Sequence, residues 1–232
     1  FCFRETKKTA DLNLPNKIFE NISVKLEPVQ LEYYVKYRDE LGGVILRDGI
    51  PVFDNAENLL KNMLRLVEIA SNPYIFDQDY DREPSKYPYL LDIIYKATNQ
   101  SEKCIVWSNF KKNVDWLHIN LNEFNPVKIH GNIGIDDRNK NLDKFKTDQT
   151  CQILIATPAS LKEGFTLTVA NHCIFFDRSF SLDDYLQAQD RIHRISQEKE
   201  CHIYNLIAEN TIDLWIDELL GAKELAARFA QG

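Results

Sequence analysis

Short apolar runs recur through the second half of the chain, and their alternation with mixed, helix-like segments constrains the fold more than any other feature. The runs are rich in β-branched and aromatic residues: KCIVWSN (103–109), VKIHG (127–131), CQILIAT (151–157), HCIFFDR (172–178) and CHIYNLIAE (201–209). Buried strands that alternate with helices indicate βαβ units and a mostly parallel sheet. We therefore predict an α/β fold in which the functional groups lie at the carboxyl ends of the strands.

The first 84 residues follow a different pattern, so we predict two units: an entry segment with a protrusion (1–84) and an α/β core with a C-terminal helix (85–232). Within the first unit the pattern predicts a strand, a helix, a hairpin and a second helix at 21–26, 27–41, 44–53 and 55–70. The hairpin is expected because Asp48-Gly49 suits a type I′ turn. The second helix should stop before Asn72-Pro73, because the residue before a proline disfavours the helical conformation.

The overall charge limits the kind of partner that the chain can bind. With 35 acidic and 28 basic residues among 232, the formal net charge is −7. This argues against a uniformly basic nucleic-acid-binding surface but leaves room for a local basic strip on an acidic body. The chain begins with Phe1 rather than Met, so we expect it to be part of a larger protein.

Cysteine usage bears on the compartment. The five cysteines show no CxxC or Cys/His spacing, and four of them head or sit within apolar runs. This favours reduced thiols that pack as small hydrophobes over disulfides or zinc ligands, and we predict no metal site. No apolar run is long enough to span a bilayer and no signal-peptide pattern is present, so we expect an intracellular protein.

Residues 181–197, SLDDYLQAQDRIHRISQ, carry an unusual concentration of polar groups. Ser181 can cap a helix whose first turn holds two aspartates. Helical spacing would then place three polar side chains on one face, at i, i+4 and i+7: Gln187, Arg191 and Arg194. The apolar anchors of this helix would be Leu182, Tyr185, Ile192 and Ile195. Two arginines held in this way suit an anionic ligand, and the alternative is an exposed face paired with Asp183, Asp184 and Asp190.

The order of the motifs resembles that of a known family. KCIVWSNF is similar to motif IV, KIHGNIGIDDRNKNLDKF to the motif that follows it, ILIATPASLKEGFTLTVANHCIFFD to motif V, and YLQAQDRIHRISQ to motif VI. FRETKKTADLNLPNK (3–17), SVKLEPVQLEYY (23–34) and LRLVEIASNPYIF (64–76) are similar to the segments that precede them. Together they resemble the second RecA-like lobe, the helicase C-terminal domain, of a Swi/Snf-type superfamily-two helicase-like ATPase. The resemblance implies a RecA-like parallel sheet flanked by helices, with an N-terminal strand, helix and hairpin protrusion.

The resemblance implies that the motif VI arginines reach ATP bound on another lobe. Arg194 would be the arginine finger, with Arg191 beside it, because a guanidinium grips phosphate oxygens through two donors and stays charged. Support would come from Gln187, Asp190, His193 and Gln197. The chain has no GxxxxGK[ST] loop, so ATP with Mg²⁺ would be bound mainly by the missing first lobe, and this chain alone should be inactive.

Motifs IV to V imply a grip on one strand of DNA through its phosphates. The motif V residues are Thr157, Glu163, Gly164, Thr166 and Asp177, and Asp177 could either order the loop between the lobes or contact ribose. The implied nucleic-acid contacts are Ser108, Asn109, Gly131, Asn132, Lys162, Thr168 and Arg138. Where many relatives have Gly-Gly in motif V, this chain has Leu161-Lys162, which removes easy backbone approach at that point.

We therefore expect the second motor lobe of a double-stranded-DNA translocase, with duplex DNA and a first RecA-like lobe of the same chain as partners. Two alternatives remain open. One is an RNA or DNA helicase of another superfamily-two branch. The other is a catalytically inactive RecA-like lobe that serves as a binding module.

Overall fold

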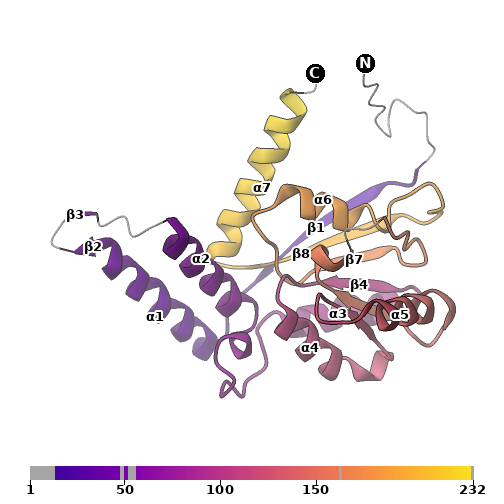
Figure 1. Cartoon of the computed structure of the whole chain (residues 1–232), viewed down its shortest axis with the longest axis horizontal. Helices are drawn as coiled ribbons and strands as arrows, with labels where there is room; N and C mark the ends of the chain where they lie inside the picture. The colour runs from indigo at the N-terminus through magenta and orange to yellow at the C-terminus, as the bar shows by residue number, and fades with distance from the viewer. Residues whose placement is uncertain (1–13, 48–49, 52–55, 162–163, 231–232) are drawn as a thin grey trace.

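The computed structural model describes residues 14–47, 50–51, 56–161 and 164–230, and side chains of residues 41–58 lie outside this description. Six strands form one sheet in the order β1-β8-β7-β4-β6-β5, and every neighbouring pair is parallel. Their bounds are β1 (Lys17–Val24), β4 (Cys104–Trp107), β5 (Val127–Ile129), β6 (Ile153–Ala156), β7 (His172–Phe175) and β8 (Cys201–Ala208). The predicted parallel α/β fold is confirmed (Figure 1).

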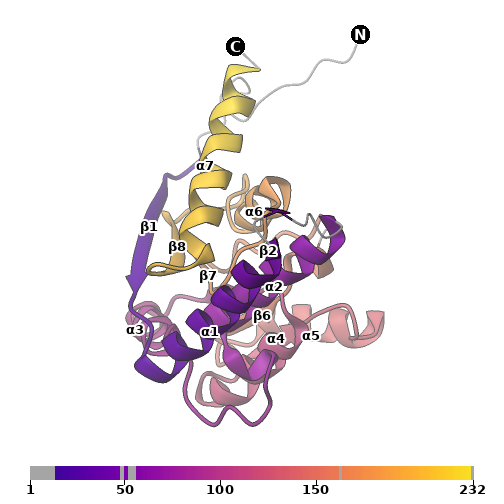
Figure 2. The same cartoon turned by 90° about the vertical axis from the view of Figure 1, so that its left-hand side faces the viewer.

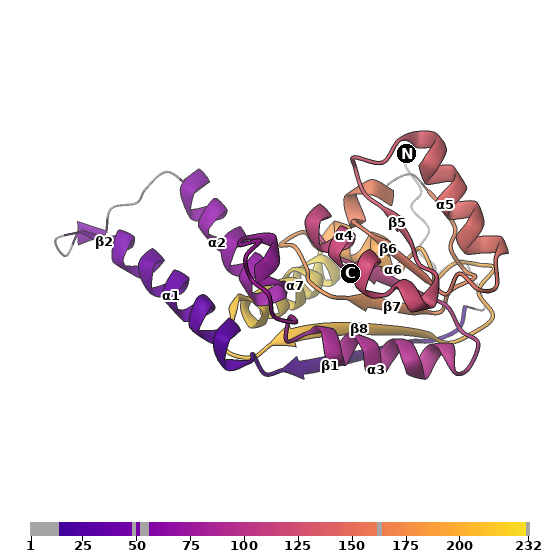
Figure 3. The same ribbon diagram turned by 90° about the horizontal axis from the view of Figure 1, so that it is seen from below.

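Helices cover both faces of the sheet, and successive strand residues point to opposite faces. Ile105 and Trp107 pack in one core with residues of α5 (Ile135–Thr147) and α6 (Leu182–Gln189). Cys104 and Val106 pack in the other core with α3 (Tyr87–Thr98) and α4 (Lys111–Asn120). Figure 3 shows α3 and α5 on opposite sides of the sheet. Three 3₁₀ turns, η1 (Pro73–Ile75), η2 (Asn122–Phe124) and η3 (Pro158–Leu161), join these elements.

The first strand belongs to the sheet itself. β1 forms its edge and pairs with β8 along its whole length, from Lys17↔Cys201 to Val24↔Ala208. The protrusion then consists of α1 (Pro28–Ile45), α2 (Ala56–Ser71) and the antiparallel pair β2 (Leu46–Arg47) and β3 (Ile50–Pro51) between them. This pairing confirms the predicted hairpin, whose Asp48-Gly49 turn lies outside the described residues. Figures 1 and 2 show α1 and α2 side by side, extending away from the sheet.

Buried polar side chains fasten the protrusion to the sheet. Gln30 of α1 is completely buried, and its amide donates to the carbonyls of Ile69 (2.8 Å) and Ala70 (3.3 Å). Its carbonyl oxygen accepts from the Ser85 N–H (2.8 Å) and hydroxyl (2.7 Å). One glutamine therefore joins α1, the end of α2 and the segment that enters the core.

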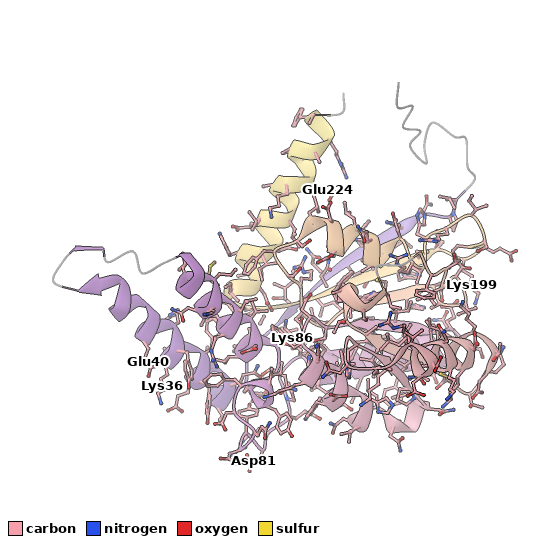
Figure 4. All side chains as sticks on the ribbon, in the orientation of Figure 1. Lys36, Glu40, Asp81, Lys86, Lys199 and Glu224 are labelled. Atoms are coloured by element: carbon pink, nitrogen blue, oxygen red, sulfur yellow. The ribbon has the colours of Figure 1, made fainter. Side chains whose placement is uncertain are left out.

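Lys86 is also completely buried, at the junction of the core and the C-terminal helix α7 (Ile212–Phe229). Its Nζ donates to the Phe176 carbonyl (2.9 Å) and lies 2.5 Å from Oδ2 of Asp213. Figure 4 shows Lys86 inside the molecule, whereas Lys36 and Glu40 lie on the outer side of α1.

The described part of the chain contains no helix that is long and apolar enough to cross a membrane. Its four cysteines, Cys104, Cys151, Cys173 and Cys201, are buried free thiols. Burial raises the pKa of Cys173 to about 12, so this thiol is uncharged at neutral pH.

Candidate functional site

The segment with the two arginines is only partly helical. Ser181 caps α6 as predicted, accepting from the Asp184 N–H at 3.2 Å. The helix ends at Gln189, so Gln187 lies on it and is exposed while Arg191 and Arg194 lie on the turns that follow. The prediction of one helical face was therefore wrong.

The backbone leaves the helical pattern after Gln189, where the Arg191 N–H donates to the Ala188 carbonyl three residues back (3.3 Å) rather than to that of Gln187. The Arg191 carbonyl accepts from the Leu167 N–H (2.9 Å), and the Ile192 carbonyl accepts from the amide of Gln197 (3.0 Å). These bonds tie the segment after the helix to the motif V loop and to Gln197. The predicted anchor Ile195 is consequently 76% exposed, whereas Ile192 is completely buried.

Arg194 lies along the motif V loop. Its Nε donates to the Asp190 carbonyl (3.1 Å), and its Nη1 donates to the Gly164 carbonyl (2.8 Å) and the Thr166 hydroxyl (3.1 Å). All three acceptors are uncharged. Among the described residues, Arg194 forms no ion pair with a carboxylate, so its positive charge is oriented but not neutralised.

Arg191 is buried, with 5% of its surface exposed. Burial, and secondly the charge of Arg194, lower the pKa of Arg191, and Asp190 opposes this shift. Arg191 nevertheless remains protonated, because the ordinary pKa of a guanidinium is far above 7. The two arginines are thus close enough for their charges to interact, and an anion between them would relieve the repulsion.

Three neighbouring side chains hold this segment in place. The buried amide of Gln197 donates to the carbonyls of Thr168 (3.3 Å), Ala170 (2.9 Å) and Ile192, and so ties the segment to the loop before β7. His193 Nε2 lies 2.8 Å from the Pro15 carbonyl, and donates to it because a carbonyl only accepts. Asp190 forms an ion pair with Lys17 at the start of β1 (3.1 Å).

Asp177 lies at the carboxyl end of β7 and is 2% exposed. Its two oxygens accept from Ser71 (2.9 Å), Ser108 (2.6 Å), the backbone and side chain of Asn109 (2.7 and 2.9 Å) and Asn113 (3.4 Å). These donors come from the end of α2, the loop after β4 and the first turn of α4. In this geometry Asp177 orders the loop after β4, and its two predicted roles, ordering the loop between the lobes and contact with ribose, stay predictions.

A hollow of about 300 Å³, which we call the strand-end hollow, opens at the carboxyl ends of β4, β5 and β6. Its lining includes the predicted nucleic-acid contacts Asn109, Gly131, Arg138 and Thr157, together with Lys111. Nζ of Lys111 donates to the Asn132 side chain (2.7 Å) and lies 3.6 Å from where a Cβ on Gly131 would stand. The buried Nε of Arg138 has no hydrogen-bond partner among the described residues.

The remaining predicted residues lie elsewhere. Ser108 is completely buried and donates to Asp177, which gives it a positioning role in this geometry. The Thr168 hydroxyl lies 2.8 Å from that of Ser196, near the arginines. Leu161, at the position where the family resemblance implied a glycine, is 1% exposed and packs in the core. Lys162 and Glu163 lie outside the described residues.

Three residues contribute to this site without having been predicted from the sequence. Ser71 and Asn113 share Asp177 with the motif IV residues, and Lys17 pairs with Asp190 across 173 positions of the chain. Local sequence carries no signal for the Ser71–Asp177 and Lys17–Asp190 contacts, because only the fold brings these distant residues together.

The fold and the polar groups at the carboxyl ends of its strands can now be compared with those of known proteins. A family model described as helicase conserved C-terminal domain matches residues 85–196, so the chain contains a helicase C-terminal, RecA-like lobe. The C-terminal part of the Fun30 ATPase domain has the same fold, with a TM-score of 0.73, 20% identity and 90% coverage of both chains.

Two proteins of higher sequence identity indicate the type of helicase-like ATPase to which the chain is similar. Chromatin structure-remodeling complex subunit snf21 of Schizosaccharomyces pombe is 27% identical over 233 residues, covering 92% of this chain and 19% of that protein. The Sulfolobus solfataricus SWI2/SNF2 ATPase core in complex with dsDNA is 26% identical with a TM-score of 0.76, covering 94% of this chain and 47% of that one. The chain is therefore similar to Snf2-type ATP-dependent helicases, and in its fold it is similar to the C-terminal lobe of Swi2/Snf2 ATPases. It spans between 10% and 25% of the length of the curated relatives that it matches.

Proposed function

We propose that this chain is the second lobe of a DNA-dependent ATPase that translocates along double-stranded DNA. In this proposal Arg194 and Arg191 act on ATP that is held by a first RecA-like lobe, and the strand-end hollow holds DNA phosphates. Relatives named as ATP-dependent helicases support the use of ATP, and the related structure in complex with dsDNA supports duplex DNA as the track.

The observation that carries the proposal is the position of Arg194. Its guanidinium is fixed by three neutral acceptors on two different loops, so the side chain is ordered before a ligand arrives while its charge is retained. Such a group stabilises negative charge that develops on phosphate oxygens without a cost of reorganisation. Lys would not replace it, because an ammonium lacks the planar fork of donors.

The residues around the arginines fit a polyphosphate. Two interacting positive charges, one buried and one half-buried, would bind an anion between them, and the nearby carboxylate of Asp190 is engaged by Lys17. No group of three potential metal ligands occurs in the described ranges, so we assign Mg²⁺ to the first lobe. ATP supplies the phosphoanhydride bond whose hydrolysis would drive the movement of the two lobes.

Movement along DNA would follow from alternating grips. Closure of the two lobes would bring Arg194 to the nucleotide, and opening after hydrolysis would release it, as in other enzymes that close around a cleft. Asn109, Lys111, Gly131, Arg138 and Thr157 would hold phosphates during each step. Phosphate contacts carry no sequence information, which suits movement along any DNA.

The test is ATP turnover by the two-lobe protein with no nucleic acid, duplex DNA, single-stranded DNA and RNA. Arg194→Ala should reduce duplex-stimulated turnover by about 10³–10⁵-fold, the range measured for arginine fingers. Arg82→Ala, which removes the charge of an exposed arginine on the loop before α3, is the matched control and should leave turnover unchanged.

Two results would overturn the proposal. Stimulation by RNA alone would place the protein in another helicase branch. Absence of turnover under every condition would leave a binding module on a RecA-like fold.

A further inference from the structure

A second and larger hollow, of about 660 Å³, lies between the protrusion and the core. One wall is the exposed face of α2, and the other is the loop after β4 with the first turn of α4. We refer to this hollow as the α2–α4 groove. Asn109 and Lys111 line both the α2–α4 groove and the strand-end hollow, so the two are neighbours along the edge of the sheet.

The α2–α4 groove is basic on a chain that is acidic overall. Among the described residues that line it, Lys61, Arg65, Lys111 and Lys112 supply four positive charges and Glu68 supplies one negative charge. The whole chain has a formal net charge of −7. Burial raises the pKa of Glu68, whereas Arg65 and Lys112 lower it, so this carboxylate is surrounded by cations of the same groove.

The groove walls hold two of these cations in defined positions. The guanidinium of Arg65 lies over the ring of Phe76, 4.8 Å from its centroid. Nζ of Lys112 donates to the Ile75 carbonyl at 3.2 Å. Lys61 and Arg65 are one helical turn apart, so they present their charges in a row along α2.

We propose that the α2–α4 groove binds the sugar–phosphate backbone of duplex DNA, and that Lys61 and Arg65 extend the phosphate contacts of the strand-end hollow onto the protrusion. The inference rests on the proposed function, in which the strand-end hollow already binds DNA phosphates. Because Asn109 and Lys111 line both hollows, one extended polyanion could pass from the strand-end hollow into the α2–α4 groove. An acidic protein segment, the other polyanion that this charge would attract, would need no such continuity.

The test is the salt dependence of binding between the 232-residue chain and a short fluorescent duplex of random sequence, followed by anisotropy. Lys61→Gln/Arg65→Gln should weaken binding at low salt. The plot of log K against log salt concentration, which falls with salt, should become less steep by about 1.8, which is twice the ~0.9 per phosphate contact. Gln has a helix propensity close to those of Lys and Arg, so α2 should be retained, and circular dichroism checks this.

Two further variants make the result specific. Lys36→Gln/Lys96→Gln removes the same charge from exposed positions on α1 and α3 and should leave the slope nearly unchanged. An equal decrease in this control would show a net-charge effect and would overturn the inference. Lys111→Gln/Arg138→Gln should also make the salt dependence less steep, because these residues would contact phosphates in the strand-end hollow.

The outcomes separate the inference from the function on which it rests. A slope lowered by Lys111→Gln/Arg138→Gln but unchanged by Lys61→Gln/Arg65→Gln would overturn only the inference. Absence of duplex binding by the wild-type chain would overturn both. An oligoglutamate peptide that binds the wild type and not Lys61→Gln/Arg65→Gln, with an unchanged DNA slope, would replace DNA by an acidic protein partner.

Discussion

Lys86 and Arg194 are two cations of the same lobe, and both donate to backbone carbonyls. Lys86 is completely buried and has Asp213 at 2.5 Å, so its charge is neutralised inside the fold. Arg194 is half-buried and donates only to neutral acceptors among the described residues. The difference teaches that a cation with an internal carboxylate holds the lobe together, whereas a cation held by neutral groups keeps its charge for a ligand.

Loss of Lys86 should have the largest effect on stability. Lys86→Met would leave Asp213 buried without its counter-charge, and we expect a loss of about 3–5 kcal/mol in the free energy of unfolding. Urea denaturation followed by circular dichroism measures this. Lys86→Met/Asp213→Leu, which removes both charges, should recover part of the loss, and an equal or greater loss in the double variant would contradict the role given to the pair.

Removal of Asp177 should be the next largest effect. Asp177→Ala would leave the buried N–H and hydroxyl donors at the end of α2 and the start of α4 without their acceptor, at a cost of about 3 kcal/mol. The measurement is again the urea midpoint. Amide hydrogen exchange would show which backbone amides lose protection. Unchanged protection at Asn109 would show that the carboxylate does not order the loop after β4.

Removal of Arg194 should have the smallest effect on stability. Its partners, the carbonyls of Asp190 and Gly164 and the Thr166 hydroxyl, are at an exposed edge where water can replace the guanidinium. We therefore expect Arg194→Ala to change the free energy of unfolding by less than about 1 kcal/mol, as is usual for surface substitutions. A loss comparable to that of Lys86→Met would mean that Arg194 is structural, and the contrast between the two cations would fail.

Local sequence was sufficient for the elements whose signal is local. The apolar runs became β4 to β8, and Ser181 capped α6 because its hydroxyl accepts from a nearby backbone N–H. The order of the motifs was enough to identify the lobe and to place Asn109, Gly131, Arg138 and Thr157 on one hollow, because parallel strands bring their carboxyl ends to the same edge.

Tertiary structure decided what depended on distant partners. The helix predicted over 181–197 ended at Gln189, and beyond it the carbonyls of Arg191 and Ile192 accept from Leu167 and Gln197. β1 joined the sheet through β8, from the opposite end of the chain. Local periodicity does not encode the contacts that three charged groups make: the five donors to Asp177, the ion pair of Lys86, and the uncharged acceptors of Arg194. The sequence by itself therefore placed Asn109, Gly131, Arg138 and Thr157 at the carboxyl ends of the strands. The fold determined which partners neutralise or orient the charged groups, because those partners come from distant parts of the chain.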